Sequence, residues 1–191
     1  MTAMCGLIYT TGGHNGDSVT SSVEFYNPEA DLWSQCASMK EHRMYHSTVE
    51  AKNHLFSVGG HNGHKRLQSA ECYDPRQGQW TSLAPMSIPR SVAGVAAFSG
   101  SLYVAGGYSN GQYLSSVEVY DLELHRWSTA PPMTSPRSAF GLEPYMGTLY
   151  AVGGFNGVFV SSTEQFTPDE GKWIGAANMP VKMAHFGIAS T

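Results

Sequence analysis

Three arginines, Arg43, Arg90 and Arg137, recur along the chain at intervals of 47 residues. A guanidinium group presents its N–H donors as a planar fork that binds a carboxylate or phosphate through two parallel hydrogen bonds. If the three forks share one surface, they predict a site for an acidic or phosphorylated peptide. The alternative is that each arginine forms an ion pair with a glutamate that recurs in the same pattern, so that the arginines stabilise the fold instead.

Eight histidines form the second group of residues with potential chemistry. His14 and His61 occupy equivalent positions, and His64 follows at the spacing His-x-x-His. No carboxylate or thiol accompanies them at the spacing of metal ligands. We therefore expect no metal and no cofactor, and histidines that are solvated or hydrogen-bonded. The sequence also has no Gly-x-Ser-x-Gly motif, no phosphate-binding loop and no paired acid and base, so we expect no catalysis.

The composition argues against several classes of protein. The chain has 191 residues, a net charge of −4 and only 14% charged residues, which gives no bulk attraction to nucleic acid or anionic lipid. No apolar run approaches the ~18 residues of a membrane span, and the N-terminus does not have the pattern of a secretory signal. Cys5, Cys36 and Cys72 form no Cys-x-x-Cys motif. We expect a reduced, cytoplasmic protein without nucleic-acid or membrane partners.

The elements that position these residues follow from an internal repeat. Gly-Gly pairs recur every 47 residues, and each is followed at nearly fixed distances by a Glu, an aromatic residue, a Trp and a Met. The arginine stands four residues after the Met in three of the four repeats, and Met183 takes its place in the last. The repeated glutamates are Glu24, Glu71, Glu118 and Glu164, and the repeated tryptophans are Trp33, Trp80, Trp127 and Trp173.

Each repeat is predicted to form four short strands. In the third repeat, residues 91–98 and 101–107 are rich in β-forming residues, 116–120 alternates polar and apolar residues, and Trp127 begins a fourth strand. Turn-forming residues separate these segments. A four-stranded sheet of this kind must stack on its neighbours to bury both faces, as the blades of a β-propeller do. The recurring Tyr, Trp and Gly-Gly are interpreted as structural.

The pattern of Gly-Gly, Glu-x-Tyr, Trp, Met and Arg resembles the kelch repeat over essentially the whole chain. The strings SSVEVYDLELHRWSTAPPMTSPRSAFG and AECYDPRQGQWTSLAPM are similar to the kelch-like proteins of animals. The resemblance implies an all-β propeller of four kelch blades, each a four-stranded antiparallel sheet. We expect one domain over residues 1–191, with repeats at 1–42, 43–89, 90–136 and 137–182 and a closing strand at 183–191.

The first repeat is expected to lack its opening strand, because only eleven residues precede Gly12. Residues 183–191 match the segment that begins at Arg137, so this C-terminal strand is predicted to complete the first blade, as in kelch propellers generally. Two alternatives stay open: a closed ring of four blades, or the last four blades of a longer ring, since kelch-like domains usually have six.

The resemblance also implies where partners bind. The loop before the first strand and the loop after Gly-Gly are expected on one face, because successive strands reverse direction. In kelch-like proteins this face binds the partner, through the arginine, the residues after it and the residues after the glycine pair. The expected partner-binding residues are His14, Asn15, Arg43, Tyr45, His61, Asn62, Arg90, Ser91, Tyr108, Asn110, Arg137, Ser138, Phe155 and Asn156.

The resemblance implies three candidate functions. The first is client recognition for a cullin-3 ubiquitin ligase adaptor, whose cullin contacts belong to a BTB domain for which these residues have no room. The second is an actin-associated cytoskeletal protein. The third is a copper oxidase similar to galactose oxidase, which requires a Cys-linked Tyr. Cys72 adjoins Tyr73, but neighbouring side chains in a strand point to opposite faces, so we expect no such linkage and no enzyme.

Overall fold

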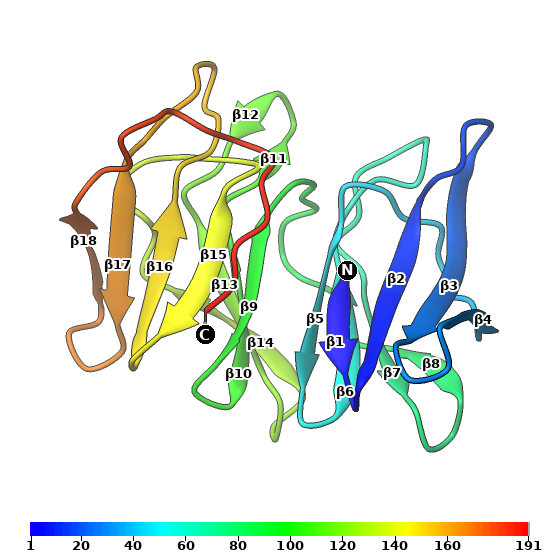
Figure 1. Cartoon of the computed structure of the whole chain (residues 1–191). Helices are drawn as coiled ribbons and strands as arrows, with labels where there is room; N and C mark the ends of the chain where they lie inside the picture. Colours follow the sequence, from blue (N-terminus) through cyan, green and yellow to red (C-terminus); the bar gives the residue numbers. More distant parts are fainter. Residues whose placement is uncertain (191) are drawn as a thin grey trace. The chain divides into compact units, whose positions relative to one another are not determined.

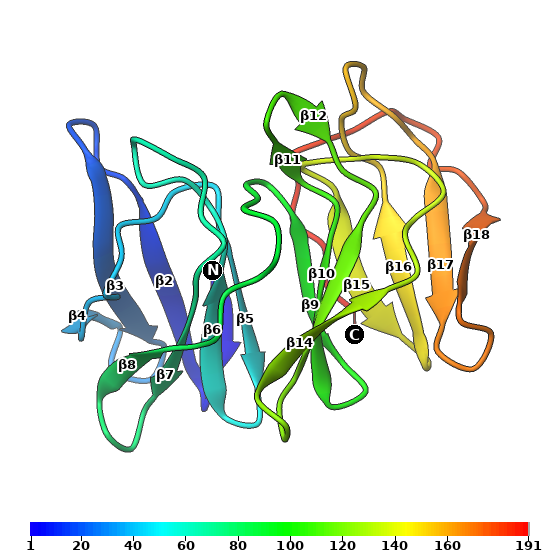
Figure 2. The ribbon, with the colours of Figure 1, turned by 180° about the vertical axis from the view of Figure 1, so that it is seen from behind.

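The computed structural model describes residues 1–190, whose regular structure is all β-strand (Figure 1; Figure 2, from behind). The predicted all-β class, built from four-stranded antiparallel sheets, is confirmed. The chain divides into two compact units, and the second begins at Arg90. This boundary coincides with the predicted limit between the second and third repeats.

Unit 1, residues 1–89, contains two sheets whose strands pair in chain order. Every neighbouring pair of strands is antiparallel, so each sheet is a simple meander. The first sheet comprises β1 (Thr2–Met4), β2 (Leu7–His14), β3 (Val19–Asn27) and β4 (Leu32–Cys36); the second comprises β5 (Ser47–Ala51), β6 (His54–Val58), β7 (Ala70–Asp74) and β8 (Gln79–Ser82).

Unit 2 contains two further meanders and a small hairpin in the loop after one glycine pair. The third sheet comprises β9 (Gly94–Phe98), β10 (Ser101–Ala105), β13 (Val117–Asp121) and β14 (Arg126–Ala130). The fourth comprises β15 (Gly141–Tyr145), β16 (Thr148–Val152), β17 (Thr163–Thr167) and β18 (Lys172–Ala176). The hairpin is formed by β11 (Tyr108–Ser109) and β12 (Gln112–Tyr113).

The first two strands of each sheet are joined by a two-residue turn that requires two left-handed residues. At Cys5-Gly6 the φ angles are 51° and 78°. Positive φ at both central positions defines the type I′ turn, whose twist matches that of the flanking strands. The equivalent turns are Lys52-Asn53, Ser99-Gly100 and Met146-Gly147.

The opening strand of the first sheet differs from the expectation. The chain's own residues Thr2–Met4 form it, pairing with Tyr9, Ile8 and Leu7 of β2, because the Cys5-Gly6 turn folds them back. Residues 183–190 contain no strand. They lie along β15 in unit 2, where the His185 N–H donates to Ala139 O and the Ser190 N–H donates to the Glu143 carboxylate. The prediction that the C-terminal strand completes the first blade is therefore wrong.

The repeated aromatic residues form the cores of the units, as predicted. The Tyr73 and Trp80 rings lie 5.3 Å apart in unit 1, and Phe166 and Trp173 are equally close in unit 2. All four are buried. Tyr26 and Trp127 are only partly buried, and Trp33 is the most exposed of the four tryptophans, with 49% of its surface exposed although it contacts Tyr26.

Each sheet has a turn end and a loop end. In unit 2, Figures 1 and 2 show the β9–β10 and β15–β16 turns at one end. The β11–β12 hairpin and the loop between β16 and β17 lie at the other. We call this second end the loop side, and use the same name for the equivalent end of each sheet in unit 1. It carries the residues that follow the arginines and the glycine pairs.

Candidate functional site

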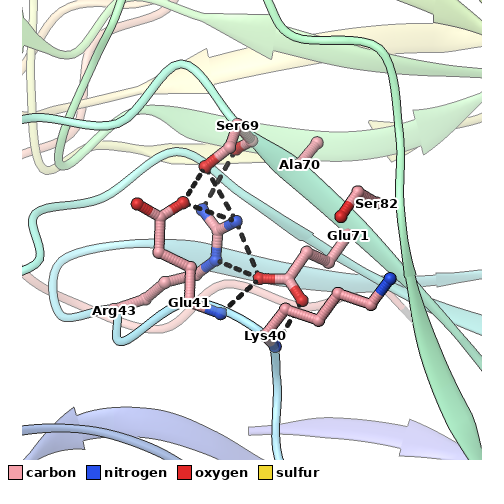
Figure 3. A pocket seen from close by; sticks show the side chains of 7 residues that line it. All are labelled: Lys40, Glu41, Arg43, Ser69, Ala70, Glu71 and Ser82. Carbon is pink, nitrogen blue, oxygen red and sulfur yellow. Dashed lines mark hydrogen bonds and ion pairs between the residues drawn. The ribbon is translucent and has the colours of Figure 1, made fainter.

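The Arg43 guanidinium lies inside the second sheet with no exposed surface. Its Nη1 donates to the carbonyl oxygens of Gly59 (2.7 Å) and Ser69 (3.0 Å). Its Nη2 and Nε both donate to Oε1 of Glu71, at 3.0 and 3.2 Å. Figure 3 shows this network. The arginine therefore ties the segment that precedes the sheet to the sheet itself.

Arg90 and Arg137 are also fully buried and repeat the contacts of the two Nη atoms, but their Nε atoms have no hydrogen-bond partner among residues 1–190. Their Nη2 atoms donate to Glu118 at 2.8 Å and to Glu164 at 2.7 Å. Burial lowers the pKa of Arg90, and the nearby Glu118 carboxylate opposes that shift. The structure thus favours the ion-pair alternative for the repeated arginines. The expectation that their forks face a partner is not met, because these side chains have no surface to offer one.

The repeated glutamates also bind backbone N–H groups of the segment that precedes each sheet. Glu71 accepts hydrogen bonds from the backbone N–H groups of Lys40 (2.6 Å) and Glu41 (3.1 Å). Glu164 accepts equivalent bonds from Thr134 (2.6 Å) and Ser135 (3.1 Å). Each carboxylate satisfies two backbone donors in addition to the guanidinium, which offsets the free-energy cost of burying the charge.

A cavity of about 350 Å³ lies beside the first of these networks (Figure 3). The Glu41 and Arg43 side chains that line it are engaged with neighbouring groups, since a Glu41 carboxylate oxygen lies 3.7 Å from Arg43 Nη2 and accepts a hydrogen bond from the Ser69 hydroxyl. We interpret this cavity as the outer edge of the structural ion pair. Its lining residues are Lys40, Glu41, Arg43, Ser69, Ala70, Glu71 and Ser82.

The structure brings together the residue after each arginine and the residue after each glycine pair. They form isolated β-bridges between two loops on the loop side. In the last of these, Ser138 N donates to Phe155 O and Phe155 N donates to Ser138 O, both at 2.9 Å. The bridged pairs are Met44 with His61, Ser91 with Tyr108, and Ser138 with Phe155. The two kinds of loop therefore share one end of the second, third and fourth sheets, as expected.

In unit 1 the predicted loop residues shape their own turns. The Asn15 side-chain oxygen accepts from the N–H groups of Asp17 and Ser18, and Asn62 accepts from those of His64 and Lys65. The Nδ1 atoms of His14 and His61 accept from the glycine two residues later. Tyr45 is different, because it has a φ of 54° and 60% of its surface is exposed. These loops present a polar surface of internally hydrogen-bonded turns, with Tyr45 exposed beside them.

In unit 2 the loop side carries a row of four aromatic rings, which we call the aromatic row: Tyr108, Tyr113, Phe155 and Phe159. Successive ring centroids are 5.1, 5.6 and 5.2 Å apart. Phe159 is 52% exposed, and the neighbouring Val158 is 63% exposed. Closely spaced aromatic rings that reach solvent are typical of protein interfaces. Predicted residues Asn110 and Asn156 lie in the same two loops.

The sequence interpretation missed two members of the aromatic row. Tyr113 and Phe159 lie in the loops that begin at the glycine pairs, but several residues further along the chain than the repeat positions. Their signal is present in the sequence as additional aromatic residues in loops that contain no charged residue. A search confined to the repeat positions does not find them, because they have no aromatic counterpart in unit 1.

A partly buried polar cluster was also missed. His46 Nε2 lies 3.0 Å from the Thr11 hydroxyl, which lies 2.8 Å from that of Thr48. Thr48 in turn donates to Ser57. His46 Nδ1 is buried and has no partner among residues 1–190. Burial, reinforced by the charge of Arg43, lowers the pKa of His46 to about 4, so this histidine is neutral in the folded protein near neutral pH.

The histidines and cysteines of residues 1–190 form neither a metal-binding cluster nor a disulfide. Across the described part of the chain, no three His, Cys, Asp or Glu side chains gather as they would around a metal ion. Cys5, Cys36 and Cys72 are free thiols. Burial raises the pKa of Cys72 to about 11. Within residues 1–190, no helix is present that is long and apolar enough to cross a membrane.

Comparison with known proteins agrees with this architecture. The family model described as the KLHDC2/KLHL20/DRC7 kelch-repeats domain matches residues 1–184. Among solved structures, the one titled "Structure of YjhT" superposes with a TM-score of 0.83 at 16% sequence identity, covering 95% of this chain and 70% of the other. The search of curated proteins returned no match. Because the family model spans nearly all of these residues, the chain belongs to the kelch-repeat family.

Proposed function

We propose that this protein binds a partner protein through its loop side and serves as the client-recognition part of a cullin-3 ubiquitin ligase adaptor. The kelch-repeat domain supports a role in protein interaction. The ligase role rests on the similarity to kelch-like proteins. In this proposal the protein works in the cytoplasm, has no catalytic activity, and engages cullin-3 only through a BTB domain outside these residues.

The aromatic row is the observation that carries the proposal. Flat aromatic side chains lose little conformational entropy on binding and dominate the energetics of protein interfaces. Here Phe155 is held by a backbone bridge to Ser138, while Phe159 extends to solvent from the same loop. The surface is therefore ordered before a partner arrives, which lowers the free-energy cost of association.

The buried arginines change the kind of partner that we expect. An acidic motif would need exposed cations, and none of the three repeated arginines is exposed. The loops that carry the aromatic row contain no charged residue between Gly106 and Ser116 or between Gly153 and Ser162. We therefore propose a partner segment that contributes apolar or aromatic side chains to this surface.

The test is affinity capture from a cytosolic extract with the wild type and with the double variant Phe155→Ala/Phe159→Ala. The matched control is Leu124→Ala, which removes a 59%-exposed side chain from the turn end of the third sheet. We expect the double variant to lose specific proteins that the wild type and the control retain, with thermal melting checked for all three. Equal capture by all three proteins contradicts the site assignment.

The ligase role needs its own measurement. An excess of this chain occupies the clients without delivering them, so cullin-3-dependent ubiquitination of the captured proteins should fall when the wild type is added. The Phe155→Ala/Phe159→Ala protein should not have this effect. If the captured proteins are not cullin-3 clients and the chain instead sediments with actin filaments, the cytoskeletal alternative replaces this proposal.

A further inference from the structure

Two junctions between successive repeats show what the repeated Glu and Trp bind. In the second sheet, the Glu71 carboxylate holds the segment that precedes it through two backbone N–H groups and Arg43. The Trp80 indole N–H donates to Ala37 O of the same segment at 2.9 Å. In the fourth sheet, Trp173 donates to Pro131 O at 3.0 Å. Glu and Trp thus form a socket for a segment of the preceding repeat.

The first sheet has the same socket, and among residues 1–190 no hydrogen bond reaches the Glu24 carboxylate or the Trp33 indole N–H. Glu24 and Trp33 stand at the positions of Glu71 and Trp80, and Ser22 stands at the position of Ser69, whose carbonyl and hydroxyl bind Arg43. Trp33 is 49% exposed whereas Trp80 is 4% exposed. Glu24 and Ser22 are also exposed. We call Ser22, Glu24 and Trp33 the open socket.

Bound segments share two chemical requirements. The residue after the repeated Met must have a backbone N–H, because Lys40 and Thr134 donate theirs to the glutamate at 2.6 Å. The residue four positions after the Met must be Arg, because its guanidinium reaches the same carboxylate. Both groups neutralise or solvate a carboxylate that the bound segment removes from water.

The equivalent segment of the last repeat, residues 177–183, meets neither requirement. Its backbone follows the usual path in its own repeat, since Met179 N donates to Ser161 O and Met183 N donates to Val160 O. However, Pro180 follows the Met and has no N–H, and Met183 stands where the arginine is required. Covering Glu24 with this segment would bury the carboxylate without its two strongest donors.

We propose that the open socket binds a segment of a further kelch repeat from outside residues 1–191, with the pattern Met-X-X-X-Arg and no proline after the Met. The arginine pairs with Glu24, the N–H after the Met completes the carboxylate, and a carbonyl two residues before the Met accepts the Trp33 indole N–H. A second copy of this chain is not the partner, because its own free segment carries Pro180 and Met183. The inference is independent of the loop side.

The test uses the full chain, labelled with ¹⁵N, and two nine-residue peptides. One has the sequence of residues 130–138, which contains Met133, Thr134 and Arg137; the other has that of residues 176–184. The Trp33 indole N–H resonance, assigned with Trp33→Phe, reports on the socket, and the Trp80 and Trp173 resonances report on the rest of the fold. Each peptide is also fused to the N-terminus through a flexible Gly-Ser linker, which raises its effective concentration toward the millimolar range.

We expect the 130–138 sequence to shift the Trp33 resonance saturably, free and fused, and to bind about tenfold or more tightly than the 176–184 sequence. Glu24→Gln in the chain, or Arg→Met in the peptide, should remove most of that preference. Equal binding of the two sequences overturns the proposal and makes a second copy of this chain an acceptable partner. No Trp33 shift from the fused 130–138 sequence also overturns it.

Discussion

Arg137 and Phe159 belong to the same repeat but differ in almost every physical respect. Arg137 has no exposed surface, recurs at the same position in three repeats, and forms hydrogen bonds with Gly153, Ser162 and Glu164. Phe159 is half exposed, has Arg66 rather than an aromatic residue as its counterpart in unit 1, and contacts the ring of Phe155. The comparison separates two roles: positions that recur hold each sheet to its neighbouring segment, and positions that vary create the surface.

The strongest test of this separation removes a buried guanidinium. Arg137→Met should destabilise the fold by about 3–5 kcal/mol, because it leaves the Glu164 carboxylate buried without its cation. Chemical denaturation measures the change in the free energy of unfolding. The control Arg126→Met alters an exposed arginine and should change stability by less than about 0.5 kcal/mol. Similar losses in the two variants would contradict the structural role of the repeated arginines.

The glycine pair offers a test of slightly smaller effect. A Cβ at Gly106 would lie 2.4 Å from Arg137 O, and this residue has a φ of 59°. Gly106→Ala should therefore cost more than the backbone strain alone, which is about 1–3 kcal/mol. Gly111 also has a positive φ, but a Cβ there meets nothing within 4 Å. Gly111→Ala should cost only about 1 kcal/mol, and thermal melting of the two variants measures the difference.

The pH dependence of stability tests His46, whose pKa is lowered by burial and by the nearby charge of Arg43. The unfolded chain protonates His46 near its ordinary pKa of 6.5, whereas the folded protein resists protonation until about pH 4. The unfolded state thus binds more protons in this range, and stability is lost as the pH falls from 6.5 toward 4. His46→Ala, which places there the residue found at Ala93, should flatten this dependence in denaturation curves.

The matched control for that measurement is the exposed His64. His64→Ala should leave the slope of stability against pH unchanged. A wild-type slope that survives in His46→Ala would assign the effect to other groups. Because carboxylates also titrate near pH 4, the informative quantity is the difference between the two variants rather than the absolute slope.

The smallest effect on stability is expected on the loop side. Phe159→Ala truncates a half-exposed ring and should change the free energy of unfolding by less than about 0.5 kcal/mol, measured by denaturation. A loss of unfolding free energy comparable to that of Arg137→Met would show that Phe159 stabilises the fold. It would contradict the separation between structural and surface positions. An unchanged fold makes this residue a clean probe of partner binding.

The repeat made the sheets predictable, because the recurring Gly-Gly, Glu, aromatic and Trp positions each fix one part of the same four-stranded unit. The opening strand of the first sheet was missed, although Cys5-Gly6 occupies the turn position of Ser99-Gly100. Three paired residues give too little periodicity to indicate a strand by themselves. The evidence for this strand in the sequence is the Cys5-Gly6 turn, which occupies an equivalent repeat position, rather than the pattern of the strand residues themselves.

The sequence predicted which loops lie together at the candidate site, but not all the residues that these loops bring into contact. The repeat located the loop side, since it identifies the loops that follow the arginines and the glycine pairs. It left open whether an arginine that recurs with a glutamate faces solvent or the sheet, because both arrangements have the same spacing. The structure distinguishes the two arrangements, because Arg43, Arg90 and Arg137 are fully buried and face the sheet. The aromatic row depends on loop conformation, which repeat spacing does not encode.

The hairpin meanders of each sheet have a consequence for how the chain reaches its native state. Each strand pairs with a strand close to it in sequence, and the type I′ turns bring the first two strands together across only two residues. The loops closed by these pairings are short, so the entropy lost before contacts form is small. Folding rates rise as contacts become more local. We therefore expect individual sheets to form early and independently, before the repeats dock on one another.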